Sequence, residues 1–180
     1  MTKLLGDILR QPDELLGSLA YAIGDGASAL ADATKVVRES EHVFVTGIGS
    51  SWHAGMAVQA RFDAARIPCR LVDASELVHY APFPDNTTLI ALSRSGRSVE
   101  IVDALPKARA AGTRVIAVTN TPDSPLAEQA DVTLRLEAAY DHQVSVTMYS
   151  ALALVGGLVA GYDAAVAHGI ADGLRAARAM

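Results

Sequence analysis

The stretch HVFVTGIGSSWHAG, residues 42–55, decides the fold. It begins with a short apolar run rich in β-branched residues, passes through a polar turn at Gly47 and Gly49, and continues with a composition typical of a helix. The same order returns in TLIALSRSGRS, residues 88–98. Strands that lead directly into helices, repeated along a chain, predict a parallel sheet with helices on both faces.

Further strands and helices complete this alternation. Strands are expected at residues 42–46, 69–72, 88–92, 114–118 and 132–136, and helices between them at residues 51–65 and 98–111. Helices also fill the first 40 residues, with a break at 24–26, and the segment from about 144 to the end, with interruptions around Gly156-Gly157 and Gly169. Right-handed crossovers then predict a three-layer α-β-α, flavodoxin-like, doubly wound sheet of five parallel strands. We expect a single domain, with residues 1–40 as helices packed on residues 41–180.

Composition argues against several classes of protein. The net charge of −5, with no basic cluster, argues against a nucleic-acid partner. One cysteine, Cys69, excludes an internal disulfide, and the five histidines lack the spacing of a zinc site. The first loop has neither the third glycine of a dinucleotide fingerprint nor the lysine of a P-loop. We therefore expect no metal and no cofactor.

The hydropathy pattern predicts a protein without a membrane span. Charged residues interrupt the N-terminal apolar runs, whereas a signal peptide has an uninterrupted apolar stretch. The uncharged segment 142–162 holds only 11 consecutive apolar residues at its centre, whereas a span needs about 20. We interpret this segment as a buried core helix and expect a cytoplasmic protein.

Two loops carry the candidate binding chemistry. Residues 46–53 and 93–98 each follow an apolar strand, contain serine and glycine, and open a helix. Ligands of doubly wound sheets bind at the carboxyl ends of the strands, and hydroxyls beside a helix N-terminus favour phosphate. The alternative is that Ser51 and Ser98 only cap their helices.

Three ordered motifs carry a family resemblance. TGIGSSWHAG (46–55), ALSRSGRSVE (91–100) and IAVTNTPDSPLAEQADVTL (116–134) resemble the sugar isomerase (SIS) domain, especially the first such domain of the isomerase half of glucosamine-6-phosphate synthase and related phosphosugar isomerases and deaminases. The resemblance implies a phosphosugar ligand. The loops and the resemblance together nominate the following binding residues: Gly49, Ser50, Ser51, Ser93, Arg94, Ser95, Gly96, Ser98 and Thr147.

The chain also departs from the family pattern. Arg94 stands where the family usually has Gln, and Arg97 where Glu is common; each arginine either contacts phosphate or points into solvent. After the fifth strand, Val146 and Met148 replace a sugar-binding serine and a lysine. The pocket therefore either accepts a different sugar or has lost its ring-opening groups.

Candidates for proton transfer are few. An aldose–ketose isomerase needs a base, usually Glu or His. His142 is the first candidate because it is expected near the pocket, followed by Glu76 and Glu100. The simpler interpretation makes Glu76 a hydrogen-bonding anchor and Glu100 a carboxylate favoured by its helix dipole.

Three functions follow. The leading hypothesis is a sugar-phosphate isomerase acting on aldose–ketose or amino-sugar pairs. The alternatives are a non-catalytic phosphosugar-binding or regulatory domain, and the first half of a longer protein with two SIS domains. We also predict a symmetric homodimer, because Leu15, Leu19, Ile23 and the segment 148–162 supply more apolar helical surface than one sheet needs.

Overall fold

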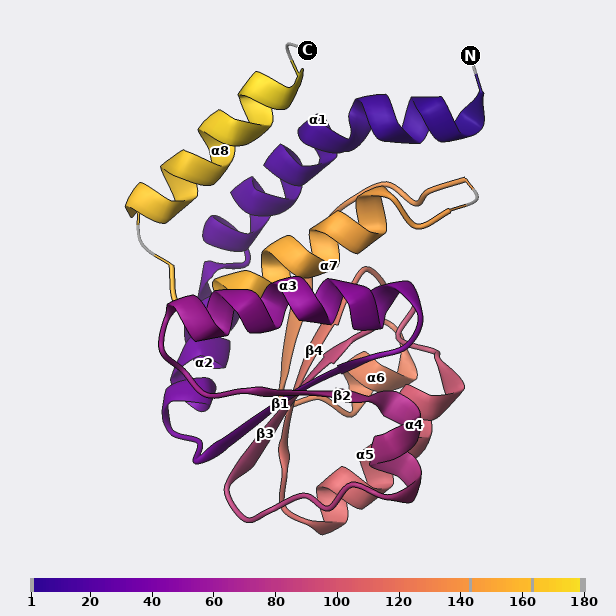
Figure 1. Ribbon diagram of the computed structural model, residues 1–180, viewed down its shortest axis with the longest axis vertical. Coiled ribbons are helices and arrows are strands. Elements are labelled where there is room, and N and C mark those ends of the chain that lie inside the picture. Colours follow the sequence, from indigo (N-terminus) through magenta and orange to yellow (C-terminus); the bar gives the residue numbers. More distant parts are fainter. Residues whose placement is uncertain (1, 143, 163, 179–180) are drawn as a thin grey trace.

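A parallel sheet forms the centre of the molecule. The computed structural model describes residues 2–142, 144–162 and 164–178. Its five strands are all parallel, in the order β2-β1-β3-β4-β5 (Figure 1). They are β1 (His42–Gly47), β2 (Arg70–Asp73), β3 (Thr87–Leu92), β4 (Arg114–Thr119) and β5 (Val132–Arg135). This is the flavodoxin-like order, so the predicted doubly wound α/β fold is confirmed.

Helices cover both faces of the sheet. They are α1 (Lys3–Ile23), α2 (Ala27–Arg38), α3 (Ser50–Ala64), α4 (Ala74–His79), α5 (Val99–Ala110), α6 (Pro125–Glu128), α7 (Thr147–Leu158) and α8 (Ala164–Arg178). Successive side chains of a strand point to opposite faces. Accordingly Val43 and Val45 of β1 pack in the larger core with α1, α2, α3 and α7, whereas Phe44 packs with α4 and α5.

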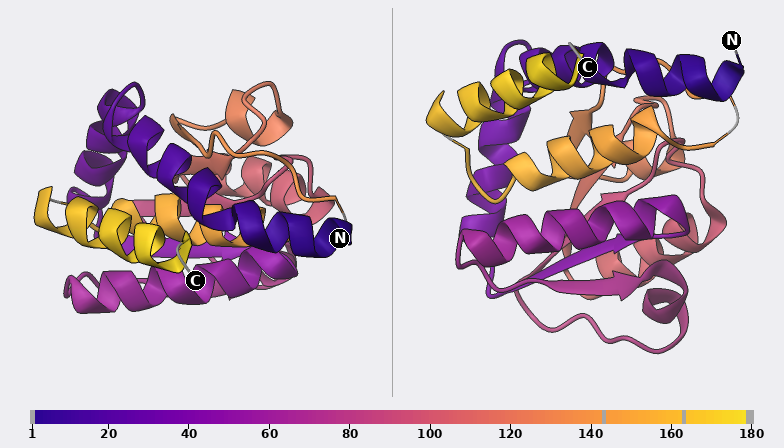
Figure 2. Two further views of the ribbon diagram at one scale, coloured as in Figure 1. Left: turned by 90° about the horizontal axis from the view of Figure 1, so that it is seen from above. Right: turned by 45° about the horizontal axis from the view of Figure 1, so that its top comes forward.

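An outer layer of helices lies on one side only. α3 and α7 cover the sheet, and α1 and α8 lie on the side of α7 that faces away from the sheet (Figures 1 and 2). α7 is therefore enclosed by other elements, and its residues Met148, Ala151 and Leu152 have no exposed surface. This confirms the buried core helix expected from the uncharged segment. Within the described ranges, no helix has the length and hydropathy that crossing a membrane requires.

The glycines expected to interrupt the C-terminal helices lie within them. Gly156, Gly157 and Gly169 lie inside helices, and the break between α7 and α8 follows Leu158 instead. A Cβ atom at Gly156 would lie 2.9 Å from Cγ2 of Val58, so this glycine allows α7 to approach α3 closely. The expected helix at residues 163, 179 and 180 lies outside the described residues.

The apolar faces predicted for a partner are covered within the chain. Leu15 and Leu19 are buried in the larger core, and Ile23 packs against it. Most of α7 is buried in the same core. Four of the exposed large apolar side chains instead form a row at the N-terminal end of α1, namely Leu4, Leu5, Ile8 and Leu9.

Candidate functional site

The candidate site is a cleft at the point where the strand order reverses. β1 and β3 are neighbours in the sheet, and their following connections run to helices on opposite faces, which is where ligands of this fold bind. The loops after β1 and β3 and the segment before α7 enclose a cleft of about 370 Å³. Its lining residues are Ile48, Ser50, Ser51, Arg94, Ser95, Ser98, Val144 and Ser145.

The loop after β1 is shaped by its glycines. Gly49 has φ +57° and ψ −124°, a conformation open to glycine, and it is the N-cap residue of α3. A Cβ atom at Gly47 would lie 2.6 Å from the carbonyl carbon of Ser51, so only glycine permits this turn. Because Gly49 is the N-cap residue, Ser51 lies in the first turn of α3, and its hydroxyl does not cap the helix.

The loop after β3 is held by serine hydroxyls. The Oγ of Ser93 accepts a hydrogen bond from the Gly96 N–H at 3.1 Å and lies 3.2 Å from the Oγ of Ser98. Gly96 has φ +60°, and a Cβ atom there would lie 2.0 Å from the Oγ of Ser124. Ser98 is the N-cap residue of α5, but its side chain makes no capping bond within the described chain. Its hydroxyl faces the loop and the cleft instead of the helix.

The two arginines of this loop point in different directions. Arg94 lines the cleft, and its guanidinium carbon lies 5.6 Å from the centre of the Tyr140 ring. The Tyr140 hydroxyl is in turn 2.6 Å from the Oγ1 of Thr121. Arg97 is exposed and donates to the backbone carbonyl of Asp123 at 2.9 Å. The cleft therefore contains the Arg94 cation, and Arg97 lies outside it.

The third wall comes from the segment before α7. The buried carboxylate of Asp141 accepts hydrogen bonds from the backbone N–H groups of Val146, Thr147 and Met148 at 2.9–3.0 Å. These are N–H groups at the start of α7, which lack acceptors within the helix. Asp141 therefore fixes the segment whose residues Val144 and Ser145 line the cleft.

The structure brings together most of the predicted binding residues. Ser50, Ser51, Arg94, Ser95 and Ser98 line one cleft. Gly49, Ser93, Gly96 and Thr147 do not line it. The first three shape its loops, and Thr147 is the buried first residue of α7.

The predicted proton-transfer residues do not line the cleft. Glu76 is exposed on α4, and Glu100 is half-buried in the first turn of α5. The His142 ring Nδ1 is 2.7 Å from Oδ1 of Asp7, a buried carboxylate of α1 that also lies 2.9 Å from Nη2 of Arg10. Hydrogen bonds from the His142 ring and backbone N–H hold the pKa of Asp7 below its ordinary value, against the effect of burial, and Arg10 adds to the lowering.

Sequence reasoning missed three lining residues and the residue that supports Arg94. Ile48 lies inside the first motif but carries no polar group that could mark it. Val144 and Ser145 also line the cleft, but the family resemblance points to the neighbouring position 146 as the sugar-binding one. Tyr140 stacks with Arg94 from 46 positions further along the chain, and no local pattern signals that contact.

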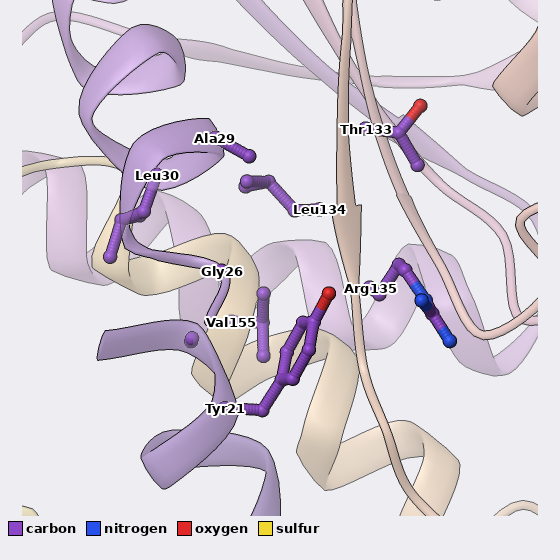
Figure 3. Close-up of a pocket in the computed structure, with 9 residues that line it drawn as sticks. Tyr21, Gly26, Ala29, Leu30, Thr133, Leu134, Arg135 and Val155 are labelled. Atoms are coloured by element: carbon purple, nitrogen blue, oxygen red, sulfur yellow. The ribbon is translucent and has the colours of Figure 1, made fainter. Parts of the chain in front are cut away.

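A second hollow is too small for a sugar. Figure 3 shows it between the α1–α2 connection, β5 and α7, with the Tyr21 and Arg135 side chains at its edge. Its volume of about 20 Å³ leaves room for about one water molecule. Across the part of the chain that the structure describes, no three His, Cys, Asp or Glu side chains gather in a way that could hold a metal ion.

Comparison with known families agrees with this geometry. Residues 37–158 match the SIS domain family. The chain belongs to the SIS domain family. This SIS protein is 31% identical to glutamine–fructose-6-phosphate aminotransferase (isomerizing) of Streptomyces coelicolor over 150 residues, covering 80% of the chain and 24% of that protein. It is 37% identical to arabinose 5-phosphate isomerase KdsD of Francisella tularensis over 101 residues, covering 55% of the chain and 31% of that protein.

A solved structure shares the fold of this SIS protein. The C-terminal domain of glucosamine-fructose-6-phosphate aminotransferase from Francisella tularensis has a TM-score of 0.83 at 21% sequence identity. The match covers 99% of this chain and 54% of that domain. The chain thus spans about a quarter of the aminotransferase relative and about half of this solved domain.

Proposed function

We propose that this SIS protein binds a sugar phosphate in the cleft between the β1–α3 and β3–α5 loops. The observation that carries the proposal is the convergence of Ser50, Ser51, Arg94, Ser95 and Ser98 on one cleft beside the N-termini of α3 and α5. Hydroxyls, a guanidinium and unpaired N–H groups of a first helical turn are the donors that a phosphate dianion accepts from. No Asp or Glu is present among the described lining residues to oppose an anion.

The reaction we propose is the interconversion of aldose and ketose, or amino-sugar, phosphates. Two relatives whose names include isomerase or isomerizing activity on sugar phosphates support this reaction class. Ser145 places a hydroxyl on the third wall, next to the position where the family serine is replaced by Val146. A cytoplasmic location belongs to the same proposal, because a charged sugar phosphate does not cross a lipid bilayer unaided.

The second candidate function is phosphosugar binding without catalysis, for sensing or regulation. The observation in its favour is that no His, Asp, Glu or Lys is present among the described residues that line the cleft. Proton transfer between adjacent carbons needs such a group within hydrogen-bond reach. Under the isomerase proposal, we propose that the base comes from a second copy, or from a further domain if the chain is the first half of a longer protein.

A homodimer completes the proposal. The row Leu4, Leu5, Ile8 and Leu9 of α1 is 39–59% exposed and forms an apolar edge that the described chain does not cover. Such patches mark interfaces, and two-fold dimers are the commonest assembly. Light scattering at micromolar concentration tests this part: a mass of twice 18.8 kDa supports the dimer, and a monomer contradicts it.

Calorimetric titration with fructose 6-phosphate, glucosamine 6-phosphate and arabinose 5-phosphate tests binding. Ser95→Ala and Ser51→Ala each remove a hydroxyl from the cleft and should raise Kd about 10- to 150-fold, which corresponds to about 1.5–3 kcal/mol for a hydrogen bond to a charged group. Ser28→Ala, on the exposed face of α2, is the matched control. Unchanged affinities in both cleft variants would move the site elsewhere. Proton NMR of the same mixtures then separates the two candidates, because only an isomerase converts the added sugar.

A further inference from the structure

One edge of α1 contacts the third wall of the cleft. Asp7, Arg10, Gln11 and Glu14 are spaced so that all four lie on one face of the helix. All four side chains hydrogen-bond to backbone groups of the segment 139–146, of which the structure describes residues 139–142 and 144–146. The bonds are His142 N–H to Asp7 (2.9 Å), Arg10 to the Tyr140 carbonyl (2.7 Å), Gln11 to the Val146 carbonyl (3.2 Å) and Ala139 N–H to Glu14 (2.7 Å).

Asp7 is the centre of this contact. Its side chain has no exposed surface, and it accepts two hydrogen bonds from His142, one from the backbone N–H and one from the ring, besides its ion pair with Arg10. A buried carboxylate is costly unless it is paired and hydrogen-bonded. If the segment 139–146 moved away, Asp7 would lose both bonds from His142. The carboxylate therefore favours the arrangement in which the segment rests on α1.

The other side of the same segment faces the ligand cleft. Val144 and Ser145 line it, and Tyr140 supports the guanidinium of Arg94. Figures 1 and 2 show the chain that leads into α7 running beside the N-terminal half of α1. A continuous path of hydrogen bonds and packing thus joins α1 to one wall of the cleft.

We propose that α1 positions the third wall of the sugar-phosphate site, with Asp7 as the positioning residue, so that ligand binding and the docking of α1 on the segment 139–146 favour each other. This inference rests on the proposed sugar-phosphate site. α1 lies outside residues 37–158, the part of the chain that matches the family. Affinity would thus be adjusted by a helix that the family match does not include.

Calorimetry and amide hydrogen exchange on the full chain test this coupling. Asp7→Asn keeps the size of the side chain but removes its charge. We expect it to raise the Kd of fructose 6-phosphate about tenfold, within the range usual for coupled sites. Exchange at the N–H groups of His142 and residues 146–148 should become faster in the same variant. Asp32→Asn, the same change at an exposed site on α2, should alter neither quantity.

A reciprocal measurement separates positioning from a purely structural role. Coupling requires that saturating fructose 6-phosphate slow amide exchange in residues 7–14 of the wild-type chain, although α1 does not line the cleft. Because ligand binding also stabilises the whole fold, coupling requires that this protection exceed the protection of α2, which does not contact the described residues of the segment. If Asp7→Asn does not fold, Glu14→Gln and His142→Ala weaken the same contact from less buried positions, and both should raise Kd.

The outcomes distinguish this inference from the function on which it rests. Wild-type binding with unchanged affinity in Asp7→Asn, and no ligand protection of α1, overturns the positioning role and leaves the site in place. Absence of wild-type binding to all three sugar phosphates overturns the proposed function, and the coupling with it. Faster exchange at residues 146–148 in Asp7→Asn would then show only that the carboxylate holds the segment.

Discussion

The imidazole Nδ1 of His142 lies 2.7 Å from Oδ1 of Asp7, a carboxylate 135 residues earlier in the chain. The histidine that sequence reasoning nominates for proton transfer is thus the partner of a buried carboxylate on α1. Its side chain is 47% exposed, and the residue does not line the cleft. This pairing makes the contact between α1 and the segment 139–146 dependent on charge.

The Asp7 pairing predicts a pH-dependent contribution to stability. Because the folded-state pKa of Asp7 is lower than the unfolded value of about 3.9, its contribution is fully present above that value and is lost as pH falls through the folded pKa. Asp7→Asn should therefore lower the free energy of unfolding most at neutral pH, and the difference from wild type should shrink below about pH 4. Urea unfolding between pH 3 and 7 measures it, with Asp32→Asn as control. A difference that stays constant with pH would contradict the pairing.

Arg94 and Arg97 provide a matched test of the cleft. Arg94→Gln removes the cation that lines the cleft and should raise the Kd of fructose 6-phosphate by about tenfold or more, since charged hydrogen bonds are worth about 1.5–3 kcal/mol. Arg97→Gln removes an exposed cation bonded to the Asp123 carbonyl and should leave Kd nearly unchanged. Calorimetry at two salt concentrations measures both. Equal effects of the two variants would mean that only the overall charge of the loop matters.

The strands and both serine loops could be predicted from the sequence because their signals are local. An apolar run such as residues 88–92, followed at once by Ser93 to Ser98, reports a strand end and a helix start within a few positions. Each strand accordingly lies within one residue of its predicted bounds. The convergence of Ser51 and Ser95 on one cleft follows from the strand order, since the carboxyl ends of neighbouring parallel strands share an edge.

The third wall could not be predicted because its contacts are long-range. Asp7 and His142 are far apart in sequence, and neither residue type indicates the other. The same reason applies to the interface prediction: Leu15 and Leu19 have the spacing of one apolar face, but only the folded chain shows that this helix packs on α7 and α8 and that both residues lie in the larger core. Gly156 resembles a helix break in sequence, yet its missing side chain serves the packing of α7 on α3.

Cys69 should be a slowly reacting thiol. Burial raises its pKa to about 11, and the Asp63 carboxylate adds to the effect. The thiolate is the reactive form, and an unperturbed cysteine has a pKa of about 8.5, so alkylation at pH 7.5 should be more than about tenfold slower in the folded chain than in urea. Iodoacetamide labelling followed by mass spectrometry measures both rates. Asp63→Asn should increase the folded-state rate, and equal rates in the folded and unfolded chain would contradict the raised pKa of Cys69.

Gly156 and Gly157 are adjacent in α7 but should respond oppositely to alanine. Alanine stabilises a helix interior by about 1 kcal/mol relative to glycine. At Gly157 the new Cβ would lie 3.6 Å from Cγ of Arg61, an ordinary contact, so Gly157→Ala should raise the free energy of unfolding by up to about 1 kcal/mol. At Gly156 it would lie 2.9 Å from Cγ2 of Val58 and 3.2 Å from Cδ2 of Leu92, two side chains with no exposed surface.

Overpacking of this kind costs about 1–3 kcal/mol, which exceeds the gain in helix propensity, so Gly156→Ala should lower the free energy of unfolding. Urea unfolding of the two variants beside the wild type measures the signs directly. Val58→Ala removes the methyl groups that the new Cβ would meet, so it should reduce the cost of Gly156→Ala in the double variant. Stabilisation by both alanines would show that α7 does not pack on α3 as closely as Gly156 allows.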